Sequence, residues 1–188
     1  GFLPSILNIT EQDNKDTLHS IYISPLKSLA KDIKRNISIP INDMKMNINI
    51  DIRTGDTTSY NKRKIRINPP NLLITTPESF ALLMSYEKPE QYFSSLKYII
   101  IDELHNLIHT KRGDLLSLNL ARLNILSPNI CKIAMSATIK KKKEALSYIS
   151  GKKKGTIISS NIQIFPKIKI LETSKKIPWA GHMANYAI

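Results

Sequence analysis

Short apolar runs alternate with amphipathic segments along most of the chain. Several runs are rich in isoleucine and apolar at consecutive positions, which is typical of strands that are covered on both faces of a sheet. They predict six strands, at His19–Ser24, Ile48–Arg53, Leu72–Thr75, Lys97–Ile101, Lys132–Ser136 and Thr156–Ser159. Lys167–Thr173 has the pattern of a further strand.

The segments between these runs carry apolar residues at helical spacing. Leu26–Ile37 presents one apolar face, and a helix that begins at Pro77 presents Phe80, Leu82 and Leu83. In Asp114–Leu126 two adjoining stripes predict a wide apolar face: Leu116, Leu120 and Leu123, and Leu118, Ala121 and Ile125. The alternation of strands and helices predicts an α/β fold, a doubly wound and mostly parallel sheet with helices on both faces.

Length and composition exclude several classes of protein. The 188 residues suit one ordinary domain, and a 41% share of apolar residues excludes a wholly disordered chain. A single cysteine, Cys131, excludes a disulfide scaffold and a multi-cysteine zinc site, and we expect it to be inert packing in a buried strand. No apolar run reaches the ~18–20 residues of a membrane span, and the N-terminus does not resemble a signal peptide. We therefore expect a cytoplasmic protein with no membrane partner.

The charge is strongly basic and unevenly distributed. The formal net charge is +13, although 31 Ile, 22 Lys and no Val indicate an AT-rich genome that contributes lysines without function. Residues 140–176 hold 11 Lys against 2 Glu, a net charge of +9. A localised basic stretch points to a polyanionic partner such as nucleic acid, although Lys140–Lys143 also fit a solvated start of a helix.

Ligands of open parallel sheets bind beyond the carboxyl ends of the strands, so the residues there are candidates for chemistry. Asp102 and Glu103 directly follow three isoleucines. An acid that emerges from an apolar strand suits Mg²⁺ held together with phosphate oxygens, and Glu103 could orient or deprotonate an attacking water. Two alternatives stay open: the acids cap the next helix, or Asp102 is a phosphoacceptor.

Hydroxyl and glycine residues follow the other strands. Ser24 is predicted to cap a helix whose first residue is Pro25, with Lys27 in its first turn, and Thr75-Thr76 precede Pro77 in the same way. Such helix N-termini suit phosphates, and two along one edge could contact successive phosphates of a nucleic-acid strand. For the segment at Ser24 and Pro25 taken alone, an ordinary capped helix is the favoured interpretation.

The ordered set of motifs resembles a known family. SPLKSLA, RTGD, TTPES, DELH and SAT, between about Ile21 and Thr138, resemble motifs Ia, the glycine turn, Ib, II and III of superfamily 2 (DEAD/DEAH-box) helicases. The longer phrases NPPNLLITTPESF and IIIDELHNLIHTKRGDLLSLNLARL are similar to the large helicase-related (Lhr-type) family, and PWAGHMANYAI suggests its ligase-associated subgroup. The resemblance implies a first RecA-like ATP-binding domain at 1–173 and, at 174–188, a connector toward a second RecA-like domain.

The resemblance also implies roles. Asp102 would hold Mg²⁺ through water, Glu103 would be the catalytic base for ATP hydrolysis, and His105 would couple hydrolysis to movement by contacting Ser136, Ala137 and Thr138. The partner would be single-stranded nucleic acid, with DNA favoured, and its contacts would be to phosphates. The residues implied to line its backbone are Ser24, Pro25, Lys27, Thr54, Gly55, Thr75, Thr76 and Pro77.

The chain also departs from the family. It contains no G-x-x-x-x-G-K-[ST] phosphate loop, and Leu26 stands where relatives often have a hydroxyl. The sequence resembles a family member truncated at both ends, so we expect no useful ATPase activity from this chain alone. The alternative function is a non-catalytic, basic nucleic-acid-binding fragment, or the remnant of a split helicase gene, whose binding would be indifferent to Asp102→Asn.

Overall fold

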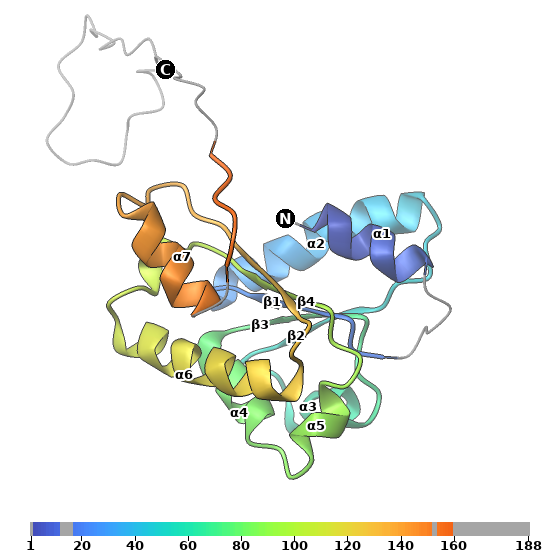
Figure 1. The fold of residues 1–188 in the computed structure, drawn as a ribbon. Helices are drawn as coiled ribbons and strands as arrows, with labels where there is room; N and C mark the ends of the chain where they lie inside the picture. The colour runs from blue at the N-terminus through green and yellow to red at the C-terminus, as the bar shows by residue number, and fades with distance from the viewer. Residues whose placement is uncertain (1, 12–16, 152–153, 160–188) are drawn as a thin grey trace, which may run out of the picture. The chain divides into compact units, whose positions relative to one another are not determined.

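A computed structural model describes residues 2–11, 17–151 and 154–159. It contains a five-stranded sheet in the order β2-β3-β1-β4-β5, with every neighbouring pair parallel (Figure 1). The strands are β1 Ser20–Ile23, β2 Ile50–Arg53, β3 Leu72–Thr75, β4 Tyr98–Ile101 and β5 Cys131–Ala134. The predicted α/β fold with a doubly wound parallel sheet is confirmed.

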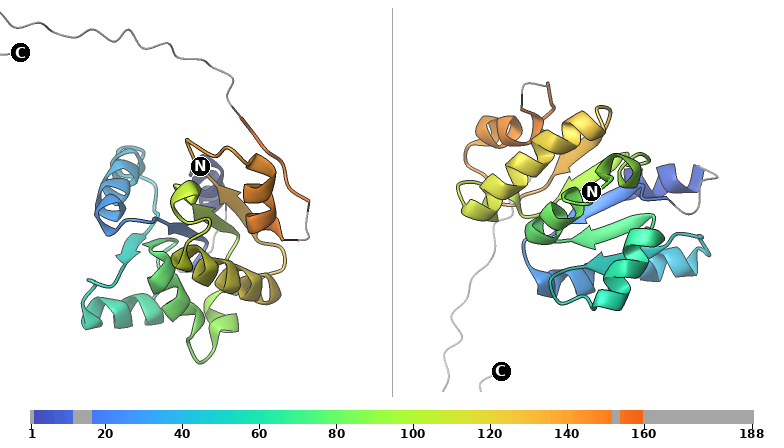
Figure 2. Two further views of the ribbon diagram at one scale, coloured as in Figure 1. Left: turned by 90° about the vertical axis from the view of Figure 1, so that its left-hand side faces the viewer. Right: turned by 90° about the horizontal axis from the view of Figure 1, so that it is seen from below.

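Helices cover both faces of the sheet, with α1 and α2 on one side and α4 and α6 on the other (Figure 1, Figure 2). None of those in the described ranges is long and apolar enough to cross a membrane. The helices are α1 Leu3–Glu11, α2 Lys27–Asp43, α3 Ser59–Ile67, α4 Pro77–Met84, α5 Pro89–Tyr92, α6 Lys111–Leu126 and α7 Lys142–Ser150, with a 3₁₀ turn, η1, at Leu104–Asn106.

The strands divide their side chains between two cores, because successive residues of a strand point to opposite faces. Ile21, Ile23, Leu73, Ile99 and Ile101 belong to the core formed with α4 and α6. The alternate positions, Tyr22, Leu72, Ile74 and Ile100, belong to the core formed with α1 and α2. Burial on both faces explains why these strands read as continuous apolar runs.

The predicted apolar faces of the helices are only partly correct. On α6 the stripe of Leu116, Leu120 and Leu123 is buried, but Leu118 and Ile125 are 70% and 79% exposed. Ala121 is exposed as well, so the wide apolar face was wrong. The reason is that α6 packs against the sheet and α4 along one stripe, and the described residues place no element over its outer side. Leu26 and Leu82, also expected to be buried, are exposed, and Leu26 precedes the first residue of α2.

Two expectations at the end of the sheet were wrong. Cys131 is exposed, because β5 is an edge strand. Thr156–Ser159 is irregular and exposed instead of forming a sixth strand, and it pairs with none of the five strands of the sheet. An apolar run of four residues does not by itself reveal whether a pairing partner exists.

The chain divides into a compact unit, Gly1–Ile157, and a second unit, Ile158–Ile188. The first holds all the elements above. The predicted strand at Lys167–Thr173 and the predicted boundary between residues 173 and 174 lie outside the described residues.

Candidate functional site

The register of the sheet places the candidate residues along one edge. Ile23, at the end of β1, is the partner of both Thr75 and Ile101, and Ile101 is the partner of Ala134. The four strands therefore end at the same level. The segments that follow them are held together by backbone bonds: Asp102 N donates to Ile23 O (2.9 Å), and Met135 N donates to Ile101 O (2.8 Å).

The carboxylate of Asp102 is held by two donors. The hydroxyl of Tyr22 donates to Oδ2, and the backbone N of Glu103 donates to Oδ1 at 2.9 Å. Tyr22 is buried, and its ring stacks on that of Phe2 with centroids 4.5 Å apart. Burial, and next the bond to Asp102, raise the pKa of the Tyr22 hydroxyl well above its ordinary value, so it stays a donor.

Glu103 lies at the turn from β4 into η1. Its φ of 46° is in the left-handed region, which is uncommon for a residue with a Cβ and recurs at functional sites. Its Oε2 atom is buried and accepts no hydrogen bond from the described residues, although Nδ1 of His105 lies 3.2 Å away. The site therefore contains a carboxylate oxygen with unused acceptor capacity.

His105 is joined to the segment after β5. Its Nδ1 lies 2.8 Å from the Ser136 hydroxyl oxygen, and Leu104 N donates to Met135 O at 3.0 Å. Ala137 and Thr138 follow in an exposed turn. Of the three residues expected to contact His105, the structure shows the contact for Ser136.

The acidic pair fits a hydrated Mg²⁺ ion. Mg²⁺ keeps most of its water and takes one or two carboxylates along with phosphate oxygens. Each oxygen of Asp102 accepts one bond from the chain and so retains a lone pair, and Oε2 of Glu103 retains both. No group of three or more ligating side chains occurs among the described residues.

The helix start after β1 differs from the prediction. Helix α2 begins at Lys27, two residues later than expected, and Leu26 is its N-cap without a side-chain bond. The hydroxyl of Ser24 donates to Leu26 O (3.0 Å), and Ser24 and Pro25 are buried. Ser24 as an N-cap was therefore wrong. A hydroxyl can bond its own loop as readily as a helix, and the local sequence does not distinguish the two.

The helix start after β3 matches the prediction. Thr76 is the N-cap of α4, and its hydroxyl accepts from Ser79 N at 3.4 Å, with Pro77 as the first helical residue. The neighbouring Thr75 is buried, and its hydroxyl donates to Arg53 O at 2.7 Å. Thr54 is buried as well. The side chains of these threonines are thus turned into the protein, where they stabilise the loops. Their backbone atoms form the edge of the sheet at the carboxyl ends of the strands.

Lys27 connects the loop after β1 to the glycine turn after β2. Its Nζ lies 2.7 Å from Asp56 Oδ1, and a Cβ added at Gly55 would be 3.3 Å from it. Lys62 Nζ donates to Gly55 O at 3.0 Å. The bond from Lys27 holds the pKa of Asp56 below its usual value, with smaller contributions from the charges of Lys31 and Lys62. Lys27 and Asp56 thus form an exposed ion pair, and an exposed ion pair contributes little to stability, so a phosphate can replace Asp56 at small cost.

Lys140–Lys143 lie exposed at the start of α7, where Lys141 pairs with Glu144 at 3.3 Å. Most of the basic stretch from 140 to 176 lies outside the described residues. The same is true of Trp179 and of the closing PWAGHMANYAI.

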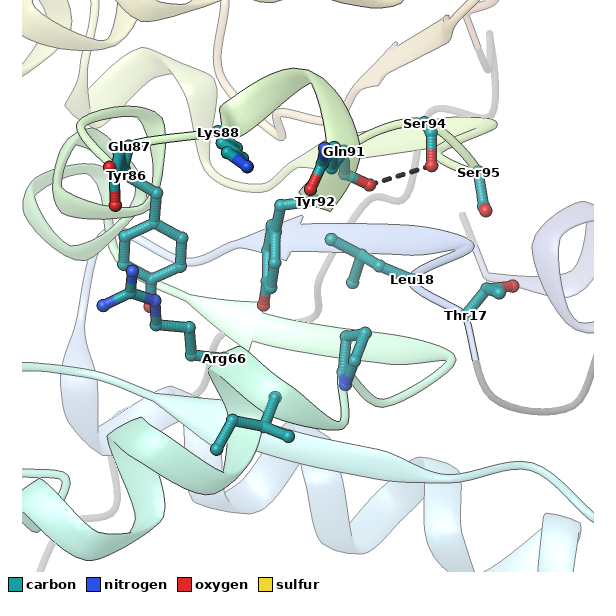
Figure 3. Close-up of a pocket in the computed structure, with 12 residues that line it drawn as sticks. Thr17, Leu18, Arg66, Tyr86, Glu87, Lys88, Gln91, Tyr92, Ser94 and Ser95 are labelled. Atoms are coloured by element: carbon teal, nitrogen blue, oxygen red, sulfur yellow. Dashed lines mark hydrogen bonds between the residues drawn. The ribbon is translucent and has the colours of Figure 1, made fainter.

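The structure also has a cavity that the sequence did not indicate. It measures about 350 Å³ and is lined by Thr17 and Leu18, which precede β1, by Ser94 and Ser95, which precede β4, and by Tyr86 and Tyr92 (Figure 3). It therefore lies toward the amino ends of the strands. None of the predicted site residues lines it.

The fold and the acidic pair at the carboxyl ends of the strands define a RecA-like α/β domain. The DEAD/DEAH box helicase family matches residues 1–146, and the chain belongs to that family. It is 37% identical over 161 residues to the ATP-dependent helicase Lhr-Core of Saccharolobus solfataricus, a match that covers 81% of this chain and 18% of that protein. It is 32% identical to the Lhr helicase/uracil glycosylase of Escherichia coli, covering 86% of this chain and 11% of that protein.

A solved structure agrees with these relatives. The Mycobacterium smegmatis helicase Lhr, bound to single-stranded DNA and AMP-PNP, matches with a TM-score of 0.75 and 34% identity over 84% of this chain and 21% of that one. The predicted resemblance to Lhr-type helicases is confirmed. The chain spans less than a quarter of the length of these relatives.

Proposed function

We propose that this chain is the first RecA-like domain of an Lhr-type helicase that couples ATP hydrolysis to movement along single-stranded DNA. A second RecA-like domain would complete the motor, and we expect it to work in the cytoplasm. The support comes from family membership and from a relative that binds single-stranded DNA and AMP-PNP.

One observation carries the hydrolytic part of the proposal. Glu103 presents a buried oxygen without a hydrogen bond, next to the two-donor cradle of Asp102 and to the His105–Ser136 contact. A buried carboxylate oxygen left unpaired is costly unless a ligand or water completes it. We assign that place to the water that attacks the γ-phosphate.

The residues of this chain would then have separate roles in ATP hydrolysis. Tyr22 and the backbone N of Glu103 hold the carboxylate of Asp102 in place, and this carboxylate would orient the water shell of Mg²⁺. Glu103 accepts the proton of the attacking water at Oε2. His105 transmits the change to the segment after β5 through Ser136, and we include Ala137 and Thr138 in that segment. Mg²⁺ bound with ATP supplies positive charge that offsets charge on the phosphate oxygens.

The nucleic-acid part of the proposal uses the same edge of the sheet. Lys27 and the backbone at Gly55 are exposed, and the N-terminus of α4 at Thr76 and Pro77 carries the positive end of the helix dipole. Ser24, Pro25, Thr54 and Thr75 would act through the shape they give the loops. Contacts to phosphates predict binding that is tolerant of base sequence and weakens with salt.

The test uses the protein expressed from its complete coding sequence. Glu103→Gln keeps the shape of the side chain but removes the base, so DNA-stimulated phosphate release should fall by at least about a hundredfold. Single-stranded DNA binding should stay within about twofold of wild type. Glu87→Gln, an exposed residue that lines the cavity toward the other ends of the strands, is the matched control and should leave hydrolysis unchanged.

Two results would contradict the proposal. Phosphate release that survives Glu103→Gln would remove Glu103 from the chemistry. A wild-type protein that binds DNA without hydrolysing ATP, and whose binding is unchanged by Asp102→Asn, would favour the non-catalytic binding module.

A further inference from the structure

Arg112, the second residue of α6, joins two loops that are far apart in the sequence. Its Nη2 donates to Pro25 O at 2.8 Å, across 87 positions of the chain. Its Nε donates to Glu78 Oε1 at 2.5 Å, and Nη2 also lies 3.3 Å from Glu78 Oε2, across 34 positions. One guanidinium thus connects the loop after β1 with the first turn of α4, which follows β3.

The contact needs the shape of arginine. A guanidinium is a planar group with five N–H donors, so it can reach a carboxylate with one edge and a carbonyl with another. A lysine carries the same charge on a single nitrogen and cannot reproduce this pair of contacts in fixed geometry. The bond from Arg112 also holds the pKa of Glu78 below its usual value, which keeps that carboxylate charged.

The backbone that carries Arg112 is itself firmly placed. Thr110 caps α6, and its hydroxyl accepts from Gly113 N at 3.1 Å. Gly113 packs so closely on the backbone just after η1 that an added Cβ would lie 2.0 Å from Leu107 O. The hydroxyl of Tyr148 donates to Gly113 O. The start of α6 is therefore pinned to the segment that leads away from Glu103.

Glu78 places a negative charge at this edge of the sheet, and Arg112 offsets that charge. A carboxylate in the first turn of α4 is favourable for the helix dipole, but it repels a phosphate that approaches the same N-terminus. Pairing with Arg112 offsets that repulsion and fixes the distance between the two loops at the same time.

We propose that Arg112 is a positioning residue for nucleic-acid binding, which sets the spacing between residues 24–27 and the N-terminus of α4. The inference rests on the proposed function, because that function places the nucleic-acid backbone on these two segments. It concerns shape rather than charge, and this distinction makes it testable.

Four variants of this chain separate shape from charge: Arg112→Lys, Arg112→Gln, Glu78→Gln and Arg122→Gln. Arg122 is exposed near the other end of α6, so Arg122→Gln matches the loss of charge without touching the loops. Binding of fluorescein-labelled oligo(dT) is measured by anisotropy at low and moderate salt. Thermal melts by circular dichroism show which variants are folded.

We expect Arg112→Lys and Arg112→Gln to weaken binding alike, by about threefold to thirtyfold, while Arg122→Gln stays within about twofold. Glu78→Gln is the variant that best separates the effect of shape from the effect of charge. It removes a negative charge from the phosphate-binding edge, so electrostatics alone predicts tighter binding, whereas loss of the bridge predicts weaker binding. We expect it to be weaker.

Hydrogen exchange gives a second measurement, which does not depend on DNA. Amides in segments 24–29 and 76–80 should exchange faster together in Arg112→Lys, and those of α2 beyond its first turns should not. If Arg112→Lys binds like wild type, or Glu78→Gln binds more tightly, the inference is overturned. If wild type binds no DNA while the exchange result holds, the proposed function fails and Arg112 is a structural bridge only.

Discussion

The hydroxyl of Tyr22 on β1 donates a hydrogen bond to the carboxylate of Asp102, which directly follows the neighbouring strand β4. Ile100, the register partner of Tyr22, and Asp102 lie on the same face of the sheet because they are two positions apart. The ring of Phe2 stacks on the ring of Tyr22. The acid at the centre of the site is therefore held from the side by a buried tyrosine.

Tyr22→Phe should lower the free energy of unfolding by about 1–2 kcal/mol, because a hydrogen bond to a charged group is lost while the stacking on Phe2 remains. Urea denaturation of the chain measures this. Tyr98→Phe is the control, since the Tyr98 hydroxyl bonds to none of the described residues, and it should change stability by less than about 0.5 kcal/mol. Equal effects of the two changes would show that the bond to Asp102 contributes nothing.

Gly113→Ala should destabilise the domain by about 2–3 kcal/mol. The added methyl group would lie 2.0 Å from Leu107 O, so the backbone at Leu107, just after η1, would have to move. In an unhindered helix the same change stabilises, since alanine is the better helix former. Chemical denaturation measures the sign of the change in stability, and a stabilised variant would show that the backbone at Leu107 moves easily.

Helix α6 offers a matched pair of leucines. Leu120→Ala should cost about 2–5 kcal/mol, because Leu120 is buried between α6 and the sheet. Leu118→Ala, two residues away and 70% exposed, should stay within about 0.5 kcal/mol. Thermal or urea unfolding of the two variants tests the packing of α6, and similar losses would mean that Leu118 is covered in solution.

Stability should fall as the pH is lowered through the range in which His19 titrates. His19 is buried, with Nδ1 2.7 Å from the Ser20 hydroxyl and Nε2 2.8 Å from Asn8 Oδ1. Burial, and next the charge of Lys97, lower its pKa below 6.5 in the folded state. Protonation then favours the unfolded chain, so its contribution is present above the unfolded pKa and is lost as the pH falls through the folded pKa.

Melting temperatures between pH 7.5 and 5 check this expectation. His19→Gln keeps a hydrogen-bonding side chain without titrating, so its melting temperature should fall less steeply over that interval than that of wild type. Parallel slopes for wild type and His19→Gln would rule out His19 as the cause.

The sequence by itself determined the fold class and the place of the acidic pair. Apolar runs of four residues that alternate with amphipathic segments are a local property, and they suffice for a parallel sheet with helices on both faces. The carboxyl ends of parallel strands meet at one edge, so Asp102, Thr76 and Gly55 could be assigned to one site without coordinates. The order and spacing of the motifs then identified the family.

The tertiary structure decided which of these groups face outward and what holds them. Leu118 and Leu120 both fit an apolar helix face, but Leu120 is buried and Leu118 is 70% exposed. The Ser24 hydroxyl could cap a helix or bond to its own loop, and in the structure it donates to the loop carbonyl of Leu26. The bond from Tyr22 to Asp102 and the bridge from Arg112 join residues 80 and 87 positions apart. Such contacts depend on the strand order and on helix placement, which no local pattern contains.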